Sequence, residues 1–299
     1  MNTDSRCGGP LTFDLGTFGE DLAGNFRDIV GIAERLCSGC AAYHVGFVAR
    51  RAANPGMSVA VDRQQMVTIL RRLLPRAGGT DDIHVVIAGA SDSGILATCA
   101  GGAFLAGRSV QDRVRYTAID RCGTPLELCR RYATRNGITF SSIVADVLGS
   151  RLLVAADVVV VHSLLRHIPR ERHGELLGVL CGWLKPDAFL LMTHGLRSGN
   201  ESGRRRVADE RLRWLIGEGR VDLPESPDAL LGRLASDDRA RTEYSGSDEL
   251  LDLFASSPLE VLEVSSVEEK ESVDANAALR RRILLVARNR RIPETEYRR

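Results

Sequence analysis

The sequence predicts an α/β protein in which a helical segment precedes a doubly wound, mostly parallel sheet. Three observations support this fold class. Apolar runs typical of buried strands alternate with helical periodicities between residues 84 and 194. One run, Asp157–Val161, contains consecutive valines, the pattern of a strand covered on both faces. The first run, His84–Ala88, passes through a loop of small residues, Gly89–Gly94, into a helix over Ile95–Ala106. With right-handed crossovers between the strands, a doubly wound sheet is the simplest fold that this order of elements predicts.

The segment before the first strand shows helical spacing throughout. Apolar residues recur every three or four positions from about Glu20 to Arg51, and again over about Val61–Leu74. Asn54-Pro55-Gly56 separates the two runs as a turn. We therefore expect residues 1–80 to form a helical cap or lid and residues 81–299 to form the main α/β domain. A dimerisation element or the cover of a sheet edge are the alternatives for the helical segment.

The remaining elements follow in order along the chain. The expected strands are His84–Ala88, Val114–Ile119, Ile138–Val144, Asp157–Val161, Ala188–Thr193, Leu259–Ser266 and Arg282–Ala287. Further helices are expected over Pro125–Asn136, Arg170–Trp183 and Asp248–Ala255, the last capped by Ser247. A helical insertion at about residues 200–255 also contains Arg204–Gly217 and Asp228–Arg241. The segment Leu184–Asp187 is expected to be a turn.

Composition narrows the function classes. The net charge is +1, which gives no electrostatic case for nucleic acid or a membrane as the main partner. The longest apolar runs are too short to span a bilayer, and the N-terminus lacks the pattern of a secretory signal. We therefore expect a soluble, cytoplasmic protein that acts on a small molecule, and a homodimer remains open.

The cysteines are odd in number and scattered, which fits reduced thiols better than a disulfide framework. Cys37 and Cys40 form a CxxC pair with His44 nearby, but the sequence shows no fourth ligand for a zinc ion. A redox pair would follow a strand, whereas this pair falls within a helical pattern. Helix packing is the favoured interpretation, metal binding or redox chemistry is the alternative, and no metal ligand is assigned.

The loop Gly89–Gly94 has the features of a ligand-binding turn. Small side chains let the backbone approach a ligand, and the following helix directs free N–H groups toward the loop. A tight turn in another kind of α/β protein would explain the loop equally well. Asp120 and Asp146 come at the ends of the next two strands, where carboxylates can accept hydrogen bonds from ribose hydroxyls or an adenine amine. A helix N-cap or a loop charge is the alternative for either residue alone.

Five segments together resemble the class I S-adenosylmethionine-dependent methyltransferases. They are IAGASDSG after the first strand, YTAID at the second, SIVADVL at the third, VVVVHSLLRHIP at the fourth and GWLKPDAFLLMTH at the fifth. The resemblance covers about residues 83–194 and extends through Ala287 by the final two strands. It implies a Rossmann-like seven-stranded sheet with the last strand antiparallel. It also implies S-adenosyl-L-methionine as the cofactor.

The resemblance also implies roles for individual residues. The loop would face the methionine part of the cofactor, Asp120 its ribose and Asp146 its adenine, with Val147 stacked beside the adenine. The implied cofactor-binding set is Gly89, Ala90, Ser91, Asp92, Gly94, Asp120, Arg121, Asp146, Val147 and His162. The chain departs from the family at two points. Ala88 precedes the first glycine, where the family usually has an acidic residue, and Ser91 and Ser93 replace glycines. Asp92 is expected to bind the cofactor's amino group in place of the missing acid.

The expected function is methylation of an oxygen, nitrogen or sulfur acceptor in a small molecule by in-line transfer. His162, His167 and His194 are the candidate bases, since histidine accepts protons near neutral pH. Tyr43, His44 and Phe47 form a candidate substrate lid, with a packed helix face as the alternative. The competing functions are a non-catalytic S-adenosylmethionine-binding regulator and a nicotinamide-dependent oxidoreductase. The absence of a regular GxGxxG counts against the latter.

Overall fold

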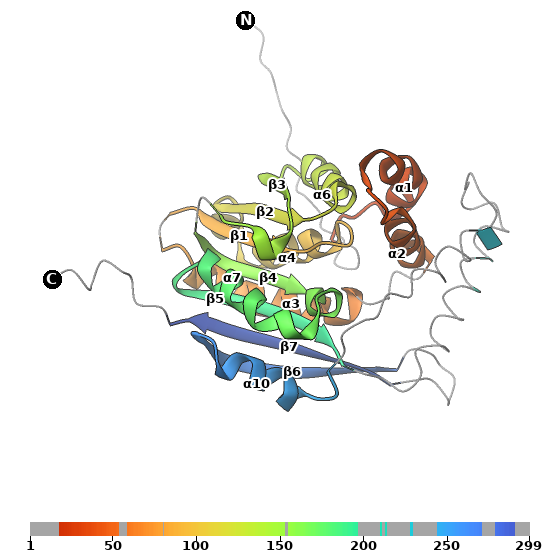
Figure 1. Cartoon of the computed structure of the whole chain (residues 1–299). Coiled ribbons are helices and arrows are strands. Elements are labelled where there is room, and N and C mark those ends of the chain that lie inside the picture. The colour runs from red at the N-terminus through yellow and green to blue at the C-terminus, as the bar shows by residue number, and fades with distance from the viewer. Residues whose placement is uncertain are drawn as a thin grey trace, which may run out of the picture.

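A computed structural model describes residues 18–53, 59–79, 81–152, 155–196, 210, 213, 228–229, 244–270 and 279–290. Within these residues the core is one seven-stranded sheet in the order β3-β2-β1-β4-β5-β7-β6 (Figure 1). The strands are β1 (Ile83–Ala88), β2 (Val114–Asp120), β3 (Phe140–Val144), β4 (Ala156–His162), β5 (Leu184–Gly195), β6 (Leu259–Lys270) and β7 (Leu279–Asn289). Strands β1 to β5 are parallel to one another, whereas β7 runs antiparallel to both β5 and β6. The predicted doubly wound sheet with an antiparallel last strand is confirmed.

Helices surround this sheet. They are α1 (Leu22–Leu36), α2 (Ala41–Ala53), α3 (Val59–Leu73), α4 (Gly94–Ala106), α5 (Arg108–Gln111), α6 (Gly123–Arg135), α7 (His173–Trp183) and α10 (Ser247–Ala255). Short 3₁₀ turns are η1 (Leu74–Arg76), η2 (Val147–Gly149), η3 (Leu164–His167) and η4 (Arg170–Arg172). Among the described residues, no helix is long and apolar enough to cross a membrane.

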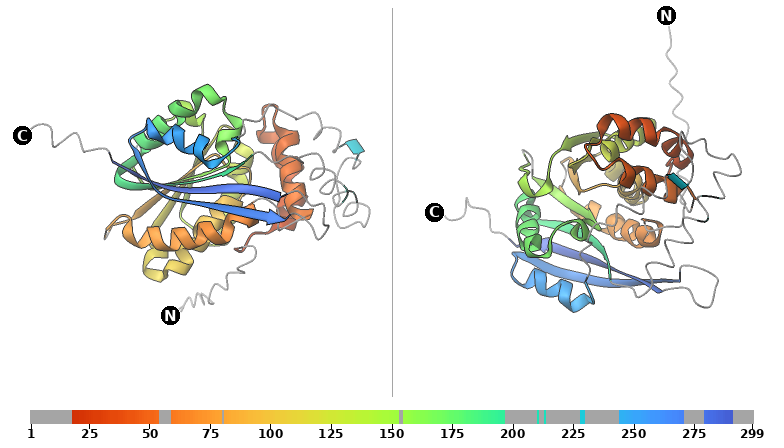
Figure 2. Two further views of the ribbon diagram at one scale, coloured as in Figure 1. Left: turned by 90° about the horizontal axis from the view of Figure 1, so that it is seen from below. Right: turned by 45° about the vertical axis from the view of Figure 1, so that its right-hand side comes forward.

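The pleat of the sheet divides the core into two layers. Val85 and Ile87 of β1 face one apolar cluster, which α3, α4 and α6 complete. Val86 and Ala88, which alternate with them, face a second cluster completed by α7 and α10. Figure 2 shows α4 and α6 on one side of the sheet and α7 and α10 on the other. This double burial explains why the central strands read as continuous apolar runs.

The helical spacing from about Glu20 to Arg51 predicts one continuous helix, and this prediction is wrong. Helix α1 ends at Leu36 and α2 begins at Ala41, so Cys37–Cys40 form the turn between two helices. Gly39 in this turn has φ +102°, a backbone conformation that glycine adopts readily. The periodicity spans the break because each helix has an apolar face of its own. These faces meet each other and Leu128 of α6 in a third apolar cluster.

Smaller differences lie at element ends. The expected turn Leu184–Asp187 is the start of β5, since Leu184 pairs with Ala156 across a register shift. Asp187 there has φ +58°, a backbone conformation that glycine adopts more readily than other residues. Ser247 begins α10 and Gly246 is its N-cap, so the predicted serine cap is wrong. The helices expected over Arg204–Gly217 and Asp228–Arg241 lie almost wholly outside the described residues.

Candidate functional site

The candidate site lies where the parallel strands β1, β2 and β4 end, and α1 and α2 stand at that end of the sheet (Figure 1). Gly89 follows β1 with φ +74°, and its N–H donates to the Ile119 carbonyl at 2.8 Å. A Cβ atom at this position would lie 2.9 Å from Cδ1 of Leu164. Glycine is therefore favoured at residue 89 by the backbone conformation, and a larger residue would also displace the Leu164 side chain of η3.

Asp120 holds the loop against the end of β2. Its Oδ2 accepts from the Ala90 N–H at 2.9 Å, and its Oδ1 accepts from the Cys122 N–H at 2.8 Å. Burial raises the pKa of the Asp120 carboxyl, and the two backbone hydrogen bonds offset this only in part. Each carboxylate oxygen has a further lone pair beyond these bonds. Asp120 can therefore support the loop and still accept hydrogen bonds from a ligand.

Asp146 lies at the same edge of the sheet. The Ala145 N–H donates to the Asp120 carbonyl at 2.9 Å, so the residue before Asp146 is joined to Asp120 itself. The Asp146 side chain is exposed and accepts from the Leu148 N–H at 2.9 Å, as the N-cap of η2. Val147 next to it is buried. The structure thus brings the two predicted carboxylates together at one edge, beside the Gly89–Gly94 loop.

Asp92 has a different environment from the one expected. Its Oδ1 accepts from the Gly94 N–H at 2.8 Å, and its Oδ2 forms an ion pair with Arg51 of α2. The side chain is 3% exposed. A buried guanidinium thus already neutralises this carboxylate, and its contact with a ligand amino group stays a prediction.

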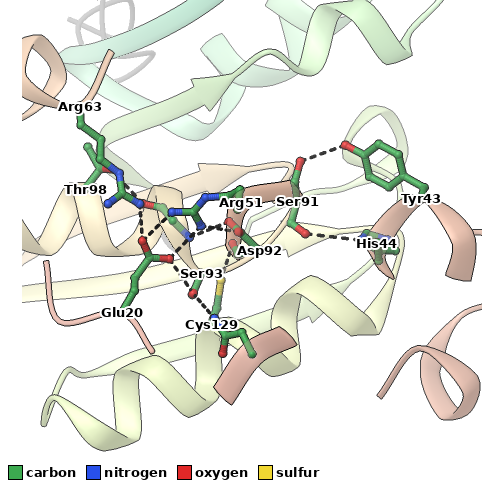
Figure 3. Close-up of polar contacts among 12 residues, drawn as sticks. Glu20, Tyr43, His44, Arg51, Arg63, Ser91, Asp92, Ser93, Thr98 and Cys129 are labelled. Atoms are coloured by element: carbon green, nitrogen blue, oxygen red, sulfur yellow. Dashed lines mark hydrogen bonds and ion pairs between the residues drawn. The ribbon is translucent and has the colours of Figure 1, made fainter. Parts of the chain in front are cut away.

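The Arg51–Asp92 pair belongs to a buried ion network that joins the helical segment to the loop (Figure 3). Arg51 also donates to both Glu20 oxygens, at 2.9 and 2.7 Å, and Arg63 of α3 pairs with the same carboxylate. The Ser93 hydroxyl donates to Glu20 at 2.9 Å. Burial acts to raise the pKa of Glu20, but Arg51 and Arg63 outweigh it and lower the pKa to about 2.

Sequence reasoning missed this network. Its members come from separate parts of the chain and share no motif, so no local pattern in the sequence connects them. The close fit also explains Gly94, where an added Cβ would lie 2.7 Å from an Arg51 guanidinium nitrogen.

Two of the three residues of the expected lid contact the loop. The Tyr43 hydroxyl lies 3.0 Å from the Ser91 hydroxyl oxygen, and His44 Nδ1 lies 3.4 Å from the Ser91 carbonyl oxygen (Figure 3). Phe47 stacks on Tyr43 with ring centroids 6.1 Å apart. The ring of Tyr43 also meets the edge of His167, which is exposed, at 5.6 Å. Helix α2 therefore lies directly over the loop and η3.

Of the three candidate bases, His162 lies in the pocket beside the loop. A small pocket is lined by Gly89, Ala90, Ser91, Asp92, Ile95 and His162. His162 ends β4 and is half-buried, and its Nε2 lies 3.2 Å from an Arg282 guanidinium nitrogen of β7. Arg282 also donates to the Ser163 hydroxyl at 2.6 Å. The sequence pointed to His162 but gave no sign that an arginine of β7 stands beside it.

His194 is not part of this pocket. It is 1% exposed, and neither ring nitrogen has a hydrogen-bond partner among the described residues. Burial, with the positive charge of Arg282 nearby, lowers the pKa of His194 to about 3. Arg121, also expected at the site, is exposed beside Asp120. Of the three candidate bases, the described structure places only His162 in the pocket.

The sequence matches no family model and no curated protein. The fold is similar to magnesium protoporphyrin IX methyltransferase (ChlM) from Synechocystis PCC 6803, solved with bound S-adenosyl-L-homocysteine. That alignment has a TM-score of 0.51 and 12% identity, and it covers 90% of this chain and 100% of the other. The N-methyltransferase NodS from Bradyrhizobium japonicum WM9 aligns with a TM-score of 0.47 and 14% identity, covering 80% and 92%. The chain has the fold of the class I S-adenosylmethionine-dependent methyltransferases.

Proposed function

We propose that the protein is an S-adenosylmethionine-dependent methyltransferase that acts on a small-molecule acceptor. The observation that carries the proposal is the joint position of Asp120 and Asp146 at one sheet edge, beside the Gly89–Gly94 loop. In a sheet of this topology, ligands bind outside the carboxyl ends of the strands where the strand order reverses. That reversal lies between β1 and β4 here.

The residues at this edge divide the recognition of the nucleoside. The remaining lone pairs of Asp120 accept the ribose hydroxyls, which need two neighbouring acceptors. Asp146 accepts the exocyclic amine of adenine, and Val147 offers an apolar surface to the ring. The backbone of Gly89–Ser91 lies against the methionine part. When bound, the cofactor supplies a methyl group already activated on a sulfonium, so the protein's main task is alignment.

His162 then stands on the acceptor side of the pocket. Because Arg282 donates to Nε2, the ring proton is assigned to Nδ1. We propose that His162 orients the acceptor as a hydrogen-bond donor, rather than removing its proton. We propose His167, which is exposed outside this pocket and next to Tyr43 of the lid, as the base. Tyr43 and Phe47 cover the loop as the lid.

Calorimetry with S-adenosylmethionine and S-adenosylhomocysteine tests the proposal. We expect both to bind and Asp120→Ala to weaken binding by about 10-fold or more, since a charged hydrogen bond contributes about 1.5–3 kcal/mol. Asp146→Ala should weaken it less, because this side chain is exposed. Asp112→Ala, an exposed carboxylate in the turn before β2, is the matched control and should bind normally.

Turnover with a panel of small-molecule acceptors tests the proposed methyl transfer. His162→Ala should lower turnover while leaving cofactor affinity near wild type, and His167→Ala should shift the pH dependence of the rate. Absence of cofactor binding to the folded wild-type protein would overturn the proposal. Binding without turnover on any acceptor would favour a regulatory S-adenosylmethionine-binding protein, and binding of a nicotinamide nucleotide in its place would favour an oxidoreductase.

A further inference from the structure

Three cysteines and one histidine meet next to the candidate cofactor edge. Cys37 and Cys40 come from the α1–α2 turn, His44 from the first turn of α2, and Cys122 from the junction of β2 and α6. One side-chain sulfur or nitrogen from each lies within 4.8 Å of every other. The Sγ atoms of Cys37 and Cys122 are 3.4 Å apart. The cluster therefore unites ligands from two distant parts of the chain.

The separation of the Cys37 and Cys122 sulfurs is close to that of two ligands in a tetrahedral metal site. With Zn–S bonds of about 2.3 Å and a Zn–N bond of about 2.0 Å, the ligand atoms of a tetrahedron lie about 3.5–3.8 Å apart. A disulfide would need about 2.05 Å between two sulfurs. The 3.4 Å between Cys37 and Cys122 is too long for that bond and close to the edge of the tetrahedron.

The surroundings of the cluster orient its members as metal sites require. His44 Nδ1 faces the Ser91 carbonyl oxygen at 3.4 Å, which leaves Nε2 as the ring nitrogen for a metal. A ligating histidine nearly always donates its other N–H in this way. The Thr124 hydroxyl lies 2.9 Å from Cys37 Sγ, within reach to hydrogen-bond a thiolate. Gly39, with φ +102°, turns the chain between the two cysteines of the CxxC pair.

Burial and charge agree with a closed site. His44 and Cys122 are buried, and Cys37 and Cys40 are half-buried. Three thiolates around Zn²⁺ leave one net negative charge, and Arg121, the residue before Cys122, places a positive charge near Cys40. All four positions are filled by protein ligands, which is the pattern of structural rather than catalytic zinc.

We propose that Cys37, Cys40, His44 and Cys122 bind one Zn²⁺ ion as a structural Cys₃His site. The ion holds the α1–α2 turn against the β2–α6 junction. Cys122 donates its N–H to Asp120, and His44 contacts the loop residue Ser91, so the site fixes two neighbours of the candidate cofactor edge. The inference goes beyond the proposed methyltransferase activity and stands on the cluster alone.

The first test is the metal content of the full-length protein, purified under reducing conditions and measured by elemental mass spectrometry. We expect about one zinc per chain, and loss of most of it in Cys37→Ser, Cys40→Ser and Cys122→Ser. Cys99→Ala is the matched control, since it removes a buried cysteine of α4 outside the cluster and should keep the zinc.

A second test does not depend on whether the variants fold. Zinc is removed from the wild-type protein with a chelator, and Co²⁺ is titrated in under reducing conditions. We expect one equivalent to give the intense visible bands of tetrahedral thiolate-bound cobalt, which added Zn²⁺ then displaces. Thermal unfolding should shift to lower temperature without metal and return when Zn²⁺ is restored.

The proposal is overturned if the folded wild-type protein carries no zinc and forms no tetrahedral cobalt complex. A Cys37–Cys122 disulfide in the protein isolated without reductant, together with no metal uptake after reduction, would overturn it in favour of a redox pair. These readouts are separate from cofactor binding. A protein that holds zinc but binds no S-adenosylmethionine would remove the proposed function and leave the zinc site in place.

Discussion

Replacing Arg51 by methionine should be among the most destabilising single substitutions in the described structure. Methionine keeps much of the length of the side chain but removes the guanidinium that neutralises both Glu20 and Asp92. All three side chains are at most 3% exposed, so water cannot take over its role. Glu20 keeps Arg63 and Asp92 keeps the Gly94 N–H, but neither compensates fully for a lost buried cation.

The expected loss follows from the charges. The two arginines lower the pKa of Glu20 from 4.5 to about 2 against the effect of burial. A shift of this size corresponds to about 3 kcal/mol of preference for the ionised, folded state. Removing one partner of a buried pair costs about 3–5 kcal/mol in general. We therefore expect Arg51→Met to lower the free energy of unfolding by about 3–4 kcal/mol near neutral pH.

Urea unfolding followed by circular dichroism measures this loss by linear extrapolation. The matched control is Arg108→Met, whose ion pair with Asp112 is exposed at 85% and 60%. Such a pair contributes about 0.5 kcal/mol or less. Because the pKa of Glu20 is lowered in the folded state, its contribution is present above pH 4.5 and is lost as the pH falls toward 2. The deficit of Arg51→Met should shrink over the same range. A loss below about 1 kcal/mol at pH 7 would refute the reasoning.

Three further substitutions test other parts of the fold. His194→Leu should flatten the pH dependence of stability. Because the pKa of His194 is low in the folded state, the wild type should lose about 2 kcal/mol of its free energy of unfolding between pH 6.5 and 5. Parallel pH profiles of the wild type and the variant would contradict this. Gly89→Ala should lower the free energy of unfolding by about 1–3 kcal/mol, since φ at residue 89 is +74° and the new Cβ atom would contact the Leu164 side chain. Gly178→Ala, at an exposed position of helix α7 with open space around it, should instead raise it by up to about 1 kcal/mol. Equal effects of the two alanines in urea unfolding would rule out the backbone argument.

Most of the sheet could be predicted from the sequence because the patterns that indicate a strand lie within the strand itself. Val158–Val161 reads as a doubly covered strand, and it is the fully buried centre of β4. Asp120 and Asp146 were placed at one edge because parallel strands end at the same edge, and the structure joins them there. The break between α1 and α2 was missed, since the helical spacing continues across Gly39 and only its backbone conformation interrupts the helix.

The sequence by itself determined the order of the strands along the chain, the loop after β1 and the two carboxylates beside it. Only the tertiary structure decided that Arg51 neutralises Asp92, that Arg282 stands beside His162, and that Cys122 joins Cys37 and Cys40. Periodicity and turn residues act between near neighbours in the chain. Charge pairing, burial and metal ligation depend on distances between segments that only the packed sheet and its helices bring together.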